Sequence, residues 1–158
     1  MSAWTPVSSS RQIQTFTGEL ASGNFECIDN TTLPIRTATF TKSSSASRLR
    51  ITVRDVAKGT GPGIFYLTVN FRIDGIFISN PTNMTMKFIS NQNHQAVPGT
   101  PPRVDNTFTA VGYANGIAAG THIFTTTYSV QPIDVVGGEP YTCYRHPDAY
   151  LIEIEEIQ

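Results

Sequence analysis

Apolar and polar residues alternate with a period of two along much of this chain, as they do in a β-strand that buries one face. The clearest stretch runs from Phe65 to Ile73, where the apolar side chains alternate with Tyr66, Thr68, Asn70 and Arg72. In Arg48 to Val56, three aliphatic residues alternate with three arginines and a threonine. This second pattern predicts a strand with an arginine ladder on its outward face.

Seven further segments have the features of strands, which makes about nine in all. They are Ile13 to Leu20, Leu33 to Thr41, Ile76 to Ser79, Met84 to Ser90, Thr107 to Tyr113, Thr121 to Val130 and Tyr150 to Ile157. Turn signals rich in Gly, Pro, Asn and Ser separate these segments, and Asp74-Gly75 is typical of a hairpin turn. Many short strands at this spacing predict an all-β fold, a two-sheet antiparallel sandwich or jelly roll.

Length and charge narrow the class of protein. A chain of 158 residues without an internal repeat fits one domain, residues 11–158, preceded by an N-terminal arm, residues 1–10. The 11 Lys and Arg residues balance 12 Asp and Glu residues, which argues against nonspecific nucleic-acid binding. The apolar runs are far shorter than the roughly 20 residues that cross a bilayer, so we expect no membrane insertion. A secretory signal pattern is also missing from the first residues.

The chain has two cysteines, Cys27 and Cys143. The sequence leaves open whether they form one disulfide or remain two thiols, because it sets neither their distance nor the redox compartment.

Catalytic and metal-binding patterns are weak. Glu153 and Glu155 share a face of a predicted strand, but we expect them to pair with the arginine ladder rather than to act as a catalytic pair. Asp55 is expected to cap the end of its strand. Three dispersed histidines and one Cys-x-x-His pair do not make a zinc site. The sequence therefore predicts a protein that is not an enzyme, with no catalytic residues, metal or cofactor.

Three segments in this order resemble a known family. They are Ser47 to Asp55 followed by Arg72-Ile73-Asp74-Gly75, then Gly116 to His122, then Tyr150 to Glu156. The order is similar to that of the C-terminal β-sandwich heads of bacterial, phage and viral collagen-like or tail-fibre proteins, which are similar to tumour-necrosis-factor and complement-type jelly rolls. The resemblance covers about residues 45–157, and the chain has no collagen-like Gly-x-y run.

The resemblance implies a homotrimer at an extracellular, virion or appendage surface. In the strand from Thr121 to Val130, alternation predicts one buried side, formed by His122 and every second residue after it. Tyrosines are enriched at interfaces, and the candidates for the subunit interface are Tyr66, Tyr113, Tyr128 and Tyr150.

The leading hypothesis for function is a recognition head that binds a cell-surface receptor or glycan through polar loops. Candidate ligand-binding residues in the long loop after Ser90 and in the last loop are Asn91, Asn93, His94, Arg103, Tyr141, Tyr144, Arg145 and His146. The alternative is a structural module that trimerises and caps a fibre, capsid or appendage.

Overall fold

The computed structural model describes residues 12–18, 23–27, 33–78, 84–90, 101–134, 141–145 and 150–157. The regular structure in these ranges is all β-strand, and none of them contains a helix that would reach across a membrane. The predicted N-terminal arm, residues 1–10, lies outside the described residues.

Eleven strands are described, and they form two antiparallel sheets. In the first, the β4 sheet, the central strand is β4 (Arg48–Thr60). It pairs with β8 (Arg103–Ala114), β11 (Tyr150–Ile157) and β10 (Tyr141–Arg145). On their outer sides, β11 pairs with β1 (Gln12–Gly18) and β10 pairs with β2 (Gly23–Cys27). In the second, the β9 sheet, β9 (Gly120–Pro132) lies between β3 (Leu33–Lys42) and β5 (Phe65–Ile73), and β5 also pairs with β6 (Ile76–Phe77) and β7 (Thr85–Ile89).

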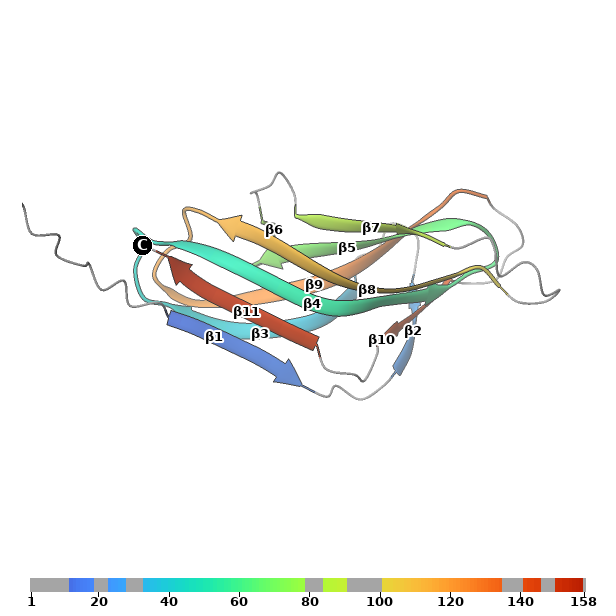
Figure 1. Cartoon of the computed structure of the whole chain (residues 1–158). Coiled ribbons are helices and arrows are strands. Elements are labelled where there is room, and N and C mark those ends of the chain that lie inside the picture. The colour runs from blue at the N-terminus through green and yellow to red at the C-terminus, as the bar shows by residue number, and fades with distance from the viewer. Residues whose placement is uncertain are drawn as a thin grey trace, which may run out of the picture.

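The two sheets pack as the layers of a sandwich, as Figure 1 shows. The predicted fold class, an all-β antiparallel sandwich, is confirmed. The order β1–β11–β4–β8 in one layer and β3–β9–β5–β7 in the other is compatible with a jelly roll, which also places eight strands in two sheets. The ribbon of β2 and β10 lies at one end of this arrangement (Figure 1).

The predicted alternation accounts for the core. The five apolar residues of β5 at alternate positions from Phe65 to Ile73 are at most 2% exposed. Leu49, Ile51 and Val53 of β4 face them from the other sheet, while Arg48 and Arg54 are exposed. Burying one such side chain fully contributes roughly 1.5–3 kcal/mol. Repeated along several strands, this burial holds the two sheets together.

β9 follows the same rule. Phe124, Thr126, Tyr128 and Val130 are buried, and Thr121, Ile123 and Thr125 lie on the other side, as predicted. The Asp74-Gly75 hairpin turn is also confirmed. Both residues have positive φ, 51° and 81°, which fits the tight turns that join two antiparallel strands.

Three expectations were wrong. The ribbon of β2 and β10 was not predicted, and Tyr141, Tyr144 and Arg145 lie in β10 rather than in a loop. Arg103 likewise begins β8, four residues before the predicted start at Thr107. Asp55 does not cap a strand end, because β4 continues to Thr60. Each error places a strand boundary at a polar residue, although polar residues continue these strands through backbone pairing alone.

Candidate functional site

The two ends of the sandwich differ in how their strands are connected. Where β4 finishes, Thr60 lies opposite Arg103 of β8 on one side and Thr142 of β10 on the other. Nearby, the first residue of β5 lies opposite the last residue of β9. The described strand ends that lead into residues 61–64, 90–102 and 133–140 all lie here. These strands belong to both sheets, and this end is called the Thr60 end below.

Two of the predicted ligand-binding residues flank β4 at the Thr60 end. Arg103 is exposed. Tyr141 is only 9% exposed, and its ring meets Phe65 edge-on with centroids 5.1 Å apart. A methyl group added at Gly61 would lie 2.1 Å from this ring. Tyr141 is therefore packed between Gly61 and the core. It stabilises the Thr60 end there instead of offering a free ring face to a ligand.

The other predicted ligand-binding residues are placed less fully. Tyr144 and Arg145 lie further along β10, opposite Asn24 and Gly23 of β2. The remaining four lie outside the described residues: Asn91, Asn93, His94 and His146. The structure therefore brings Arg103 and Tyr141 to one end of the molecule.

Cys143 is buried and disulfide-bonded. The other cysteine of the chain is Cys27, which lies opposite Tyr141 in the neighbouring strand, two positions from the partner of Cys143. Strand β10, which begins at the Thr60 end, is therefore cross-linked through Cys143.

The four tyrosines predicted to form a subunit interface do not share one face. Tyr128 and Tyr150 are 3% and 8% exposed and lie between the sheets. Tyr66 and Tyr113 lie on the outer faces of opposite sheets, and each is covered by a cation: the Lys87 Nζ is 3.8 Å from the ring centroid of Tyr66. A single contact surface can include at most one of these two outer tyrosines.

The opposite end, called the turn end below, is closed by short connections. The chain passes from β3 to β4 through residues 43–47, and the Glu156 carboxylate accepts hydrogen bonds from the backbone amides of Ser43 and Ser44 at 2.9 and 2.8 Å. It also accepts the hydroxyls of Ser43 and Ser47 at 2.7 and 2.5 Å. Burial alone would raise the pKa of Glu156, but these four donors outweigh it and lower the pKa to about 2.

A second acidic residue holds the hairpin at the turn end. The Ile123 amide donates to Oδ1 of Asp74 at 2.9 Å. In return, the Asp74 amide donates to the Ile123 carbonyl at 2.8 Å. Its Oδ2 lies 2.7 Å from Nδ1 of His122, whose Nε2 lies 3.0 Å from the carbonyl oxygen of Ala118. The Ile123 amide and then His122 lower the pKa of Asp74.

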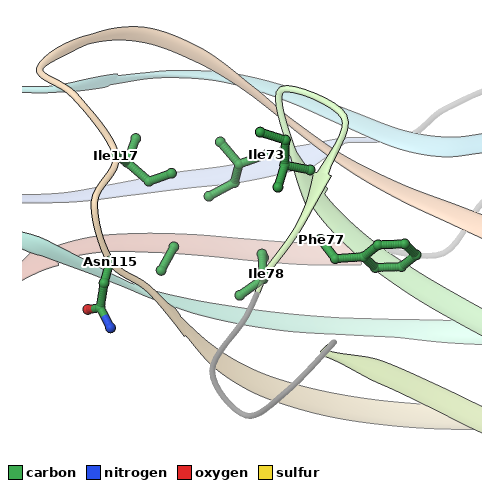
Figure 2. Close-up of a pocket in the computed structure, with 7 residues that line it drawn as sticks. Ile73, Phe77, Ile78, Asn115 and Ile117 are labelled. Carbon is green, nitrogen blue, oxygen red and sulfur yellow. The ribbon is translucent and has the colours of Figure 1, made fainter.

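A pocket of about 120 Å³ lies beside this hairpin. Figure 2 shows Ile73, Ile78 and Ile117 around it, with Asn115 at its rim and the ring of Phe77 turned away. Sites for drug-sized ligands occupy roughly 300–1,000 Å³. The pocket is thus large enough for a small apolar group only.

A buried ion pair joins the two sheets. The backbone register of β3 shifts between Pro34 and Arg36, and this bulge turns the Arg36 side chain into the core. Its Nε and Nη2 donate to the two carboxylate oxygens of Asp55 at 2.8 and 2.9 Å. Tyr128 donates its hydroxyl to the Val56 carbonyl at 2.9 Å. Burial raises the pKa of Tyr128, and the Asp55 carboxylate adds to the rise.

Sequence reasoning missed this pair, although a signal for it existed. Asp55 has the same odd-numbered phase as Leu49, Ile51 and Val53, so alternation alone places it in the core. A carboxylate buried there requires a buried cation.

Two further carboxylates lie on β11, beside β4. Glu155 pairs with Arg50 at 3.5 Å, as expected from the arginine ladder, and Glu153 lies opposite Thr52. In the ranges that the structure describes, no group of three or more His, Cys, Asp or Glu side chains is placed to hold a metal ion.

The class of protein is defined by the fold alone: the described strands form an antiparallel β-sandwich. No family model matches the chain, and no curated protein matches it. Among solved structures it is similar to dimeric latent PorU from Porphyromonas gingivalis, at 15% identity over 93% of this chain and 13% of that chain, with a TM-score of 0.49. It is also similar to the VP2 subviral particle of infectious bursal disease virus, at 11% identity over 95% of this chain and 42% of that chain, with a TM-score of 0.27.

Proposed function

We propose that this chain is a non-enzymatic, homotrimeric recognition head that binds a cell-surface receptor or glycan through the loops of the Thr60 end. The observation that carries the proposal is the difference between the two ends. Three connections, including the long segment 90–102, leave at the Thr60 end, while short hydrogen-bonded turns close the other. Binding residues are commonly placed on loops that a rigid scaffold positions.

The described ionisable residues support a binding role over a catalytic one. Asp55 neutralises Arg36, Glu156 holds the serine turn, Asp74 holds the hairpin and Glu155 pairs with Arg50. Each carboxylate already has a structural partner. A general acid or base needs a group free to exchange its proton with a substrate.

Assembly is supported by the outer face of the β4 sheet. Ile13 and Val111 are 53% and 40% exposed there, on the outer strands β1 and β8, and Tyr113 lies half-buried two residues from Val111. Burial of such residues favours association of copies, and the threefold symmetry comes from the resemblance to fibre heads. The disulfide at Cys143 supports an extracellular or appendage location, because disulfides persist in oxidising compartments.

The test combines a glycan and receptor array with light scattering. The double variant Asn93→Ala, His94→Ala, in the segment between β7 and β8, should lose capture at least tenfold while its solution mass stays at three times that of one chain. Asn115→Ala, an exposed change at the turn end, is the matched control and should capture as the unmodified protein does. Undiminished capture by the double variant would overturn the assignment to these loops, and a monomer would overturn the trimer.

A structural module that caps a fibre, capsid or appendage is the second candidate. The exposed apolar residues Ile13 and Val111 favour it, since they support assembly without a ligand. A trimer that captures nothing on the array, yet dissociates in the variant Val111→Lys, would select this function.

A further inference from the structure

The outer face of the β9 sheet carries an unusual number of hydroxyl and amide side chains. Neighbouring strands place them side by side, because Thr37 lies opposite Thr125 and Asn70 lies opposite Thr127. Asn70 donates to the Ser129 hydroxyl at 3.2 Å. This hydroxyl face consists of Thr37, Thr39, Thr41, Thr68, Asn70, Thr85, Thr121, Thr125, Thr127 and Ser129.

The charges on this face are of one sign. Among the described strand residues that face outward here, Arg72 and Lys87 are charged and no carboxylate is present. The carboxylate of Asp74, in the turn that follows β5, is already held by the Ile123 amide and His122. The Arg72 guanidinium lies 4.2 Å from the ring centroid of Phe77, and Lys87 covers Tyr66 in the same way. The outer face of the β4 sheet differs, because Glu153, Glu155 and Asp105 are interspersed among its cations. The hydroxyl face is thus complementary to an anion.

Two donors on the hydroxyl face lack an acceptor. Thr127 is 6% exposed, and its hydroxyl has no hydrogen-bond partner. The Nε of Arg72 is likewise covered and without a partner. The two residues are diagonal neighbours, since Arg72 lies opposite Thr125 and Thr127 lies opposite Asn70. A buried polar group without a partner is costly, so an acceptor supplied by a ligand is favoured at this point.

We propose that the hydroxyl face binds an acidic polysaccharide. A carboxylate or sulfate accepts hydrogen bonds from Arg72, whose side chain is partly exposed, and from Thr127, whose hydroxyl a small side-chain movement exposes. A second acidic group lies at Lys87, which is opposite Thr68, four residues along β5 from Arg72 and so roughly 13 Å away. Sugar hydroxyls between them bond to the threonines and to Asn70. The inference rests on the glycan-binding part of the proposed function but uses a different surface from the Thr60 end.

The occupant follows from the chemistry of the face. A neutral sugar leaves both cations unpaired, and a small anion reaches one of them only. Bare polyanions satisfy the charges but make no use of the hydroxyls. A chain that carries both acidic groups and hydroxyls matches each part of the face.

Equilibrium titration with oligosaccharides of hyaluronan and of heparin tests the proposal and separates carboxylate from sulfate as the acidic group. Neutral dextran and a DNA duplex are the comparison ligands. We expect binding to one or both acidic oligosaccharides that weakens at high salt, because salt screens exposed charges. Arg72→Gln and Lys87→Gln should each weaken it roughly tenfold, as loss of a charge-assisted hydrogen bond does. Arg54→Gln, the same change on the other sheet, should leave the affinity for the acidic oligosaccharides unchanged.

Thr127→Val separates recognition from stability. It removes a hydroxyl that has no partner in the free chain, so the melting temperature should not fall, while affinity for the acidic oligosaccharide should. Three results would each overturn the proposal. The first is that neither acidic ligand binds, and the second is that the DNA duplex binds with equal affinity. The third is unchanged affinity for the acidic oligosaccharide in Arg72→Gln, Lys87→Gln and Thr127→Val.

The two proposals fail separately. If Asn93→Ala, His94→Ala loses the acidic ligand and the Arg72 and Lys87 variants keep it, the hydroxyl face is not the site and the Thr60 end stands. The reverse result would reject the Thr60 end and retain the hydroxyl face.

Discussion

Replacing Glu156 by glutamine should destabilise the protein in a strongly pH-dependent manner. The carboxylate is 9% exposed and accepts four hydrogen bonds from Ser43, Ser44 and Ser47. Lys42 closes the same turn by donating to the Ser44 carbonyl. A glutamine side chain has only one acceptor oxygen. Its amide nitrogen would therefore face the hydrogen-bond donors that now donate to the second carboxylate oxygen.

The size of the effect follows from the pKa. Folding lowers the pKa of Glu156 from 4.5 to about 2, and each pKa unit is worth about 1.4 kcal/mol. The ionised carboxylate therefore contributes about 3 kcal/mol to the free energy of unfolding. Because the folded pKa is the lower one, this contribution is present above 4.5 and is lost as the pH falls from 4.5 toward 2. At a pH of about 3, roughly half of it remains.

Urea denaturation followed by circular dichroism over this pH range measures the effect. The difference between the unmodified protein and Glu156→Gln should be about 2–3 kcal/mol near neutral pH and should shrink to a few tenths near a pH of about 2. Glu153→Gln on the same strand is the control and should change stability by less than about 0.5 kcal/mol at either pH. A difference between the proteins that stays constant with pH would refute the reasoning, because it would not depend on the ionised carboxylate.

Three further changes test the other contacts. Asp55→Asn should cost about 3–5 kcal/mol in urea denaturation, since it leaves Arg36 buried without its counter-charge; a cost below about 1 kcal/mol would contradict this. Cys143→Ser should cost about 2–5 kcal/mol, and reductant should destabilise the unmodified protein but not the variant. Gly61→Ala should lower stability by roughly 1–3 kcal/mol by displacing the Tyr141 ring, whereas an unchanged melting temperature would show that the ring moves freely.

The sequence predicted the sandwich because its long strands alternate strictly. In β4, β5 and β9 the inward phase is mostly apolar, and burial follows it except at Asn70 and Thr127, which are buried on the outward side. β2 and β10 could not be found in this way. Each has only five residues, too few for a clear alternation.

The predicted interface tyrosines lie on different faces for a different reason. Alternation places Tyr128 with Phe124 and Tyr66 with Thr68, so it already separates inward from outward tyrosines. It does not say which sheet a strand joins. Tyr66 and Tyr113 lie on opposite sheets because β5 and β8 do, and pairing of this kind is set by contacts between residues far apart in sequence.

Inward polar residues and outward polar residues of this chain therefore differ in their roles. Asp55 and Glu156 point inward and accept hydrogen bonds from Arg36 and from the serine turn. Thr127 and Arg72 point outward, yet each keeps a covered donor without a partner. Arg50, on the outer face of the β4 sheet, also keeps a covered Nε, but there a carboxylate oxygen of Glu155 lies 3.5 Å from its Nη1. The described strands around Thr127 and Arg72 place no carboxylate on that face, which is the reason to look for an acidic ligand there.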